Sequence, residues 1–212
     1  MQPTRRMFFH GPPGCGKTLA AAVLAGELGM ALLTVRMDSL FSRFLGATAA
    51  HLRTIFSEMP RRPAVYFFDE FDAVAKSRGD AQDVGEMNRV VTAFLQLVDA
   101  DRSPSVLVAA TNHVQIVDRA ALRRFDAIVE FDLPDARAIY DLLLLRLAPL
   151  GLRPTDAEQL AERGVGHNFA DLARACDDSI RTMVLDDREQ LRPSDVDAAL
   201  HRLKTRLISS GR

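Results

Sequence analysis

The residues Gly11 to Thr18 follow the spacing G-x-x-x-x-G-K-T, between a short apolar run and a segment rich in helix formers. Glycines at these positions let the backbone turn its N–H groups inward around a phosphate, and the following helix adds the positive end of its dipole. The Lys17 ammonium can reach the β- and γ-phosphates of a nucleotide, and the Thr18 hydroxyl can coordinate Mg²⁺. The residues predicted to bind the nucleotide here are Gly11, Pro12, Pro13, Gly14, Cys15, Gly16, Lys17, Thr18 and Leu19.

A pair of acidic residues agrees with a phosphate-binding loop. The apolar run Ala64–Phe68 is typical of a strand buried on both faces, and it ends in Asp69 and Glu70. Because ligands of open α/β sheets lie at the carboxyl ends of the strands, we expect Asp69 to join Thr18 at the nucleotide and Mg²⁺. Glu70 would polarise a water molecule for attack on the γ-phosphate. Adjacent acids also occur in solvated turns, but beside a phosphate loop the catalytic interpretation is favoured.

The composition is that of an ordinary globular protein. The 212 residues are 48% hydrophobic and 26% charged, with a net charge of −1, so the overall charge does not favour nucleic acid or an anionic membrane as a partner. No apolar run is long enough to cross a bilayer. Two cysteines are too few for a disulfide framework and fit a reducing compartment, so we expect a cytoplasmic protein.

Strand and helix patterns alternate in the first part of the chain, and only helical patterns follow. The alternation predicts a parallel five-stranded sheet with helices on both faces over residues 1–134, followed by a small all-helical domain over residues 135–212. The expected strands are Arg6–His10, Ala31–Arg36, Ala64–Phe68, Ser105–Ala110 and Ala127–Phe131. The expected helices are Lys17–Leu28, Thr48–Met59, Gly85–Asp99, Asp118–Leu122, Arg137–Leu147, Asp156–Arg163, Phe169–Leu185 and Ser194–Lys204.

This order of domains resembles the AAA+ ATPases, and further motifs are similar to those of the AAA clade. Ala109–Asn112 ends a strand in asparagine as the sensor-1 motif does, which implies that Asn112 contacts the attacking water or the γ-phosphate. Asp118–Asp126 is similar to the second region of homology, in which two arginines reach the ATP site of the neighbouring subunit. Arg123 and Arg124 would fill that role, although many members separate the two by Pro-Gly. Which arginine dominates stays open, as does the alternative of an exposed basic pair.

The resemblance also points to a loop that contacts substrate. Ser42–Gly46 looks like the aromatic–hydrophobic–glycine loop that faces the central pore of AAA unfoldases, so Phe44 and Leu45 would grip a polypeptide. The alternative is that both side chains pack in the core. In the helical part, Gly166–Leu172 resembles the lid motif of the clade, with Asn168 and Phe169 in place of Ser-Gly.

As a function, the resemblance implies Mg²⁺-dependent hydrolysis of ATP by a ring oligomer, expected to be a hexamer, that remodels or unfolds a protein substrate or partner. A nucleotide-gated scaffold or switch that regulates a partner without threading is the main alternative, and a nucleic-acid motor is disfavoured by the charge. The chain is similar to small bacterial AAA ATPases, some of which are encoded beside a subtilisin-like protease. Five residues precede the first strand, fewer than the family places there. The chain is therefore either part of a longer protein or builds its base pocket differently.

Overall fold

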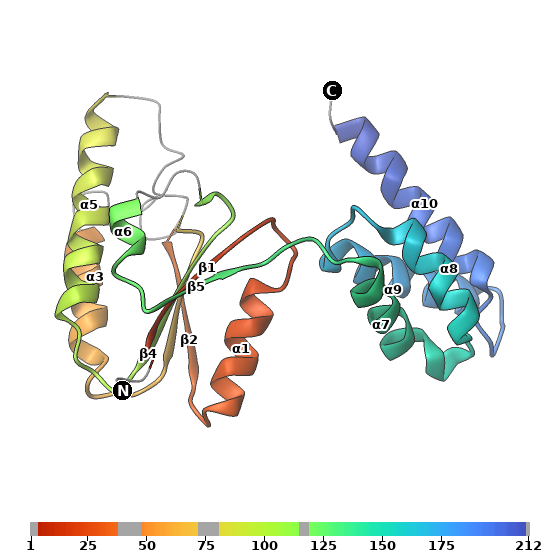
Figure 1. Cartoon of the computed structure of the whole chain (residues 1–212), viewed down its shortest axis with the longest axis horizontal. Helices are drawn as coiled ribbons and strands as arrows, with labels where there is room; N and C mark the ends of the chain where they lie inside the picture. Colours follow the sequence, from red (N-terminus) through yellow and green to blue (C-terminus); the bar gives the residue numbers. More distant parts are fainter. Residues whose placement is uncertain (1–3, 38–47, 72–80, 115–118, 211–212) are drawn as a thin grey trace. The chain divides into compact units, whose positions relative to one another are not determined.

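The computed structural model describes residues 4–37, 48–71, 81–114 and 119–210. It divides into two compact units (Figure 1). The first unit comprises Met1–Pro12 and Lys17–Phe131, and the second comprises Pro13–Gly16 and Asp132–Arg212. Each unit has its own hydrophobic core, so each is described by itself.

The first unit is built on a parallel sheet of five strands in the order β2-β3-β4-β1-β5. The strands are β1 (Arg6–His10), β2 (Leu32–Arg36), β3 (Val65–Asp69), β4 (Val106–Thr111) and β5 (Ala127–Glu130). No strand end differs from its predicted position by more than one residue. The predicted parallel five-stranded sheet, with helices on both faces and a helical region after it, is confirmed.

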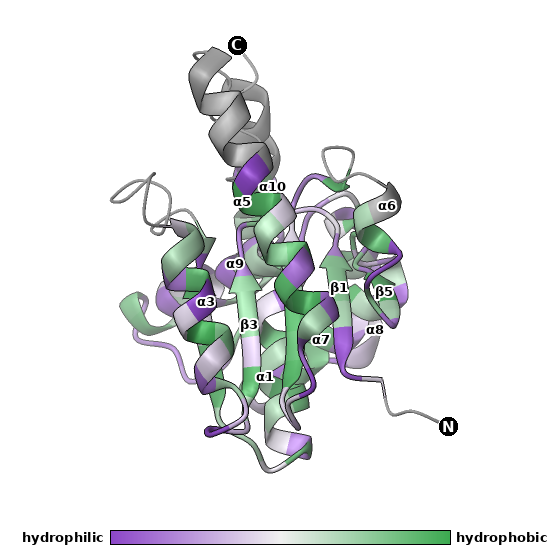
Figure 2. Cartoon of the chain, turned by 90° about the vertical axis from the view of Figure 1, so that its left-hand side faces the viewer, coloured by the Kyte–Doolittle hydropathy of each residue, from purple (hydrophilic) through white to green (hydrophobic). Residues whose placement is uncertain are grey.

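Helices cover both faces of this sheet because successive side chains of a strand point to opposite sides. Val65 and Phe67 of β3 pack in one cluster with small residues of α1 (Lys17–Glu27). Tyr66 and Phe68 belong to the cluster on the other face. Figure 1 shows α1 alone on one side of the sheet, and α3 (Thr48–Glu58), α5 (Ala81–Ala100) and α6 (Arg119–Leu122) on the other. Figure 2 shows mostly hydrophobic colour along β3.

Three phenylalanines hold α3 and α5 on the sheet. The rings of Phe56, Phe68 and Phe94 lie with centroids 5.8, 5.9 and 5.1 Å apart, and two of the three pairs meet edge to face. Such aromatic contacts add about 0.5–1.5 kcal/mol each beyond the burial of their area. The helix that carries Phe94 begins at Ala81, four residues before the predicted start at Gly85. Of the four added residues, Ala81 and Gln82 are good helix formers.

The second unit is a bundle of helices. They are α7 (Ala136–Leu147), the short 3₁₀ turn η3 (Ala148–Leu150), α8 (Pro154–Gly164), α9 (Phe169–Leu185) and α10 (Pro193–Ser210). Ile139, Leu143 and Leu147 are fully buried at four-residue spacing, so one face of α7 supplies the core. In the parts of the chain that the structure describes, no helix is long and apolar enough to span a bilayer.

The helices α7, α8 and α9 begin in different ways. Asp135 caps α7, its carboxylate accepting the Ala138 N–H at 2.7 Å. α8 begins at Pro154, two residues before the predicted start at Asp156, and its cap residue Arg153 makes no side-chain capping bond. Proline is favoured at the first helical position since its fixed φ suits the helix and it has no N–H to satisfy. Asn168 caps α9 by accepting the Asp171 N–H at 2.8 Å.

Candidate active site

The loop after β1 has the backbone that its glycines predict. Gly11, Gly14 and Gly16 have φ angles of +136°, +76° and +100°, a region that residues with a Cβ rarely adopt. At Gly11 space is also lacking, since a Cβ there would lie 2.0 Å from the carbonyl oxygen of Phe131. The chain therefore turns sharply at Gly11 directly beside the end of β5.

Lys17 is buried, with 7% of the residue exposed. Its Nζ donates to the carbonyl oxygens of Gly11 at 2.7 Å and Pro12 at 2.9 Å. An ammonium group removed from water and held against the base of the loop supplies a fixed positive charge there, which suits the β- and γ-phosphates of a nucleotide. Thr18 and Leu19, the next two predicted residues, are exposed at the start of α1.

The tip of the loop, Pro13–Gly16, belongs to the second unit. In that unit the Ala170 N–H donates to the Gly14 carbonyl at 3.1 Å, and a Cβ on Gly14 would lie 2.7 Å from the side chain of Asn168. The segment that resembles the lid motif thus makes a close backbone contact one residue beyond Phe169.

The sheet brings the remaining predicted residues to one edge. β3, β4 and β1 are neighbours, with Phe68 paired to Ala109 and His10 paired to Thr111. The loop, the acidic pair and Asn112 directly follow the carboxyl ends of these adjacent strands. Parallel strands carry their ligand sites at this edge, and Asn112, half-buried, follows the fully buried β4.

Glu70 has an unusual backbone conformation. Its φ is +57°, and the N–H of Phe71 bonds to the Ala110 carbonyl at 2.9 Å directly afterwards. The carboxylate of Asp69 accepts the Glu70 N–H at 2.8 Å, which supports the turn. A left-handed residue other than glycine costs of order 1–3 kcal/mol and is often found at functional sites.

Arg36 is a site residue that the sequence interpretation missed. It ends β2, pairs in register with Asp69, and places its guanidinium 3.7 Å from the Glu70 carboxylate. The side chains are 62% and 44% exposed, so this ion pair is a surface one and contributes little to stability. Its position as the last residue of a predicted strand was the feature in the sequence that could have indicated Arg36.

The two predicted trans-acting arginines follow α6 and differ in their surroundings. Arg123 is exposed, whereas Arg124 is half-buried and ion-paired with Asp99 of α5. The predicted substrate-contacting residues Phe44 and Leu45 lie outside the described residues.

A magnesium ion fits the donors that the sequence predicts for it. The Thr18 hydroxyl and the Asp69 carboxylate are hard oxygen ligands, and Mg²⁺ usually takes one or two protein ligands together with substrate phosphates and water. Among the described residues there is no group of three or more His, Cys, Asp or Glu side chains that could hold a metal without such help.

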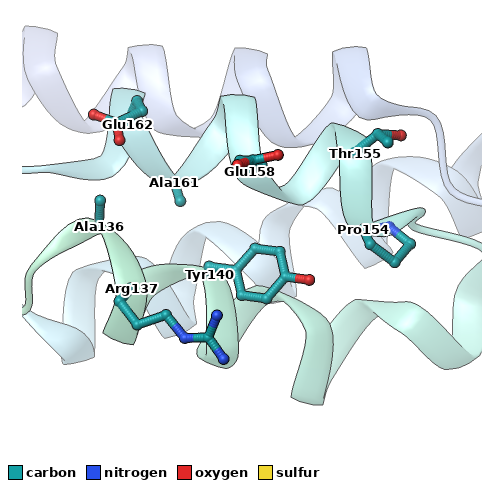
Figure 3. Close-up of a pocket in the computed structure, with 8 residues that line it drawn as sticks. All are labelled: Ala136, Arg137, Tyr140, Pro154, Thr155, Glu158, Ala161 and Glu162. Carbon is teal, nitrogen blue, oxygen red and sulfur yellow. The ribbon is translucent and has the colours of Figure 1, made fainter.

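A separate open pocket of about 310 Å³ lies in the second unit, between α7 and α8 (Figure 3). Tyr140 and Arg137 form its α7 wall, with the guanidinium 5.2 Å from the tyrosine ring centroid, and Glu158 and Glu162 stand on α8. None of the lining residues is among those predicted to bind nucleotide.

Comparison with known proteins identifies the family. Residues 7–133 match the family model described as "ATPase family associated with various cellular activities (AAA)". The chain belongs to the AAA family of ATPases. The matched range contains the phosphate loop, the acidic pair, Asn112 and both arginines.

Three curated relatives are similar to most of this chain. The chain is 40% identical over 197 residues to the uncharacterized AAA family ATPase y4kL of Sinorhizobium fredii, covering 92% of this chain and 59% of the relative. It is 36% identical to the ATPase family gene 2 protein of Saccharomyces cerevisiae, covering 85% of this chain and 24% of the relative. It is also 36% identical to Protein SAV of Sulfolobus acidocaldarius, covering 82% of this chain and 23% of the relative. The chain therefore spans about three fifths of the length of the first of these relatives and about a quarter of the length of the other two.

Proposed function

We propose that this AAA domain hydrolyses ATP with Mg²⁺ in a ring of copies and uses the reaction to remodel a protein. The observation that carries the proposal is the edge of the sheet described above. There the loop with the buried Lys17, the Asp69–Glu70 pair and Asn112 follow three adjacent strands. Membership of the AAA family supports the same reaction.

Each residue has a role set by its chemistry. The backbone N–H groups of the loop and the Lys17 ammonium bind the phosphates. Thr18 and Asp69 would hold Mg²⁺, which would neutralise phosphate charge. Glu70 accepts a proton from the attacking water as the water adds to the γ-phosphorus and the bond to the β,γ-bridging oxygen breaks. The Asn112 amide orients that water.

Charge develops on the γ-phosphoryl group in the transition state, and an arginine from the neighbouring copy would stabilise it. In other nucleotide hydrolases an arginine supplied in this way is worth on the order of 10³–10⁵ in rate. The ring is therefore part of the active site, and an isolated copy should turn over slowly. Protein rather than nucleic acid is the proposed substrate, since the net charge is only −1 and phosphate contacts need clusters of Lys and Arg.

Glu70→Gln tests the proposal directly. The variant should bind ATP and fail to hydrolyse it, whereas Lys17→Ala should lose binding itself. Glu27→Gln, an exposed glutamate at the end of α1, serves as the matched control and should behave as wild type. If Glu70→Gln hydrolyses ATP at a near wild-type rate, the proposed role of Glu70 is wrong.

The same variant tests the partner. Held in its ATP-bound state, Glu70→Gln should retain protein that the wild type releases, and proteins retained with ATP and absent without it are the substrates or partners. A nucleotide-gated switch, the alternative function, would retain one partner in a fixed ratio without unfolding it. Amide hydrogen exchange of the retained protein separates these two results.

A further inference from the structure

The pocket between α7 and α8 has no part in the proposed reaction. It has a volume of about 310 Å³ and follows the line along which the two helices meet. Figure 3 shows Ala136 of α7 beside Ala161 of α8 at one end, and Tyr140 opposite Glu158 further along. Two short alanine side chains face each other there, so the helices leave a space that longer side chains would fill.

The walls of this pocket are fixed by the core of the helical unit. Ile139 and Leu143 of α7 are buried in that core, and so are Ala157 and Leu160 of α8. The lining residues stand on the same two helices, and the half-buried Tyr140 directly follows Ile139. Side chains on packed helices are held more precisely than side chains on loops. The pocket therefore keeps its shape without a ligand.

The charged groups of the pocket are unequally paired. The Arg137 Nε lies 3.4 Å from the Asp141 carboxylate, and its guanidinium carbon lies 5.2 Å from the centre of the Tyr140 ring. Glu158 and Glu162 are exposed. Neither glutamate side chain has an ion pair or a hydrogen bond with any residue that the structure describes. The arginine of the pocket is thus occupied, whereas two carboxylates are open to a ligand.

The nearby arginines do not neutralise these carboxylates. Arg153, before the first turn of α8, and Arg163, in its last turn, are each ion-paired with an aspartate. Glu158 and Glu162 are four residues apart, so their negative charges lie on one face of the helix and repel each other. A positive charge bound between them would remove this repulsion. The acidic side of the pocket therefore favours a cationic ligand.

Tyr140 and Pro154 add an apolar surface beside the carboxylates. The Tyr140 hydroxyl makes no hydrogen bond within the described parts of the chain, so it also can bond to a ligand. An arginine side chain matches both surfaces. Its stem packs on apolar groups, and its planar guanidinium offers several N–H donors to carboxylates. The volume is at the lower end of the range for ligand pockets, which suits one or two side chains.

We propose that this pocket binds an arginine of a partner protein, with the guanidinium between Glu158 and Glu162 and the stem along Tyr140 and Pro154. The pocket is open to solvent, so the polypeptide that carries the arginine can continue outside it. The carboxylates would repel the phosphates of a nucleic acid. This site goes beyond the proposed function, because it recruits a protein to the helical unit and takes no part in the hydrolysis of ATP.

The tyrosine content of the chain allows a direct binding assay. There are two tyrosines and no tryptophan, so NMR of protein labelled at tyrosine observes Tyr140 in the pocket and the buried Tyr66 as an internal reference. The probe is the synthetic peptide Gly-Ser-Leu-Arg-Leu-Ser-Gly, acetylated and amidated at its ends. It should shift the Tyr140 signal and leave the Tyr66 signal in place. Added salt should weaken the binding, since the pairs are exposed to solvent.

Changes on either side of the contact should have the same effect. A peptide with glutamine in place of arginine should bind roughly 2- to 30-fold more weakly, the range for the loss of two exposed ion pairs. Glu158→Gln combined with Glu162→Gln should weaken the arginine peptide to the same extent and remove its advantage over the glutamine peptide. The Tm and the ATPase rate of this double variant should be those of the wild type. Glu189→Gln, at an exposed glutamate between α9 and α10, is the matched control and should bind both peptides as the wild type does.

Equal affinity of the wild type for the arginine and glutamine peptides would overturn the proposal, and this comparison needs no variant to fold. An equal shift of the Tyr140 signal by arginine amide alone, at the same concentration, would also overturn it, because the site would then take a small cation. Dissociation of an oligomer by the double variant, seen in sedimentation, would identify a second copy of this chain as the occupant in place of a partner protein. These measurements need no ATP, so they stand whether or not Glu70→Gln abolishes hydrolysis.

Discussion

Replacing Gly11 by alanine should cost more stability than the same change at any open glycine of the loop. At Gly11 the new Cβ would lie 2.0 Å from the Phe131 carbonyl oxygen, and φ is +136°. The neighbouring backbone cannot easily yield, because the Phe131 N–H is bonded to the His10 carbonyl at 2.7 Å. Relief of the overlap therefore means separating the ends of β1 and β5.

Gly16 provides the matched control. Its φ is +100°, but apart from Gly16 and its two chain neighbours no heavy atom lies within 4 Å of the position where a Cβ would be placed. Gly16→Ala thus carries conformational strain alone, about 1–3 kcal/mol. Gly11→Ala carries the same strain plus a steric overlap with backbone, for which overpacked sites typically lose a further 1–3 kcal/mol or so. For a protein of this size a difference of 1–3 kcal/mol corresponds to roughly 2–12 °C in Tm.

The assay is thermal unfolding of both variants without nucleotide, with amide hydrogen exchange to show where the loss occurs. Exchange should accelerate in β1 and β5 for Gly11→Ala and stay near wild type there for Gly16→Ala. A nucleotide-binding assay cannot separate the two effects, because both glycines belong to the phosphate loop and either variant can weaken binding. Equal losses of stability in the two variants would refute the steric argument, and so would a Gly11→Ala variant with protected β5 amides.

Three further results are expected. Burial by itself raises the pKa of Asp126, but hydrogen bonds from two backbone N–H groups at the start of β1 and the nearby guanidinium charges hold it below its usual value. The carboxylate therefore stabilises the fold fully above about pH 4. In urea unfolding, Asp126→Asn should be less stable than the wild type at pH 7. This difference in the free energy of unfolding should shrink as the pH falls below about 4. Arg188→Ala should lower the Tm of the second unit, because the Asp195 carboxylate, 10% exposed and 2.8 Å from the guanidinium, would lose its partner. The added change Asp195→Asn should recover part of the loss in Tm. Phe44→Ala should keep the basal ATPase rate and abolish processing of a protein substrate, whereas a drop in Tm of several degrees would mean that Phe44 is a core residue.

The sequence alone determined the features that depend on local chemistry. A phosphate loop needs glycines where φ is positive and a lysine at its end, so Gly11, Gly14, Gly16 and Lys17 could be identified from their spacing. Strands buried on both faces must be apolar throughout, which is why β3 and β4 were found to within one residue. The side-chain cap at Asp135 is also a local interaction, and aspartate is a preferred residue at that position.

The tertiary structure decided the pairings between residues far apart in the sequence. Arg36 meets Glu70 because β2 and β3 are neighbours in the sheet. Asp99 meets Arg124 because the turn after α6 lies beside the end of α5. Charged side chains are common on any surface and carry no periodic signal, so their partners cannot be inferred from spacing. The left-handed backbone at Glu70 is equally invisible in sequence. The residue after it, Phe71, donates its N–H to the Ala110 carbonyl of β4. That hydrogen bond can form only when β3 and β4 are side by side.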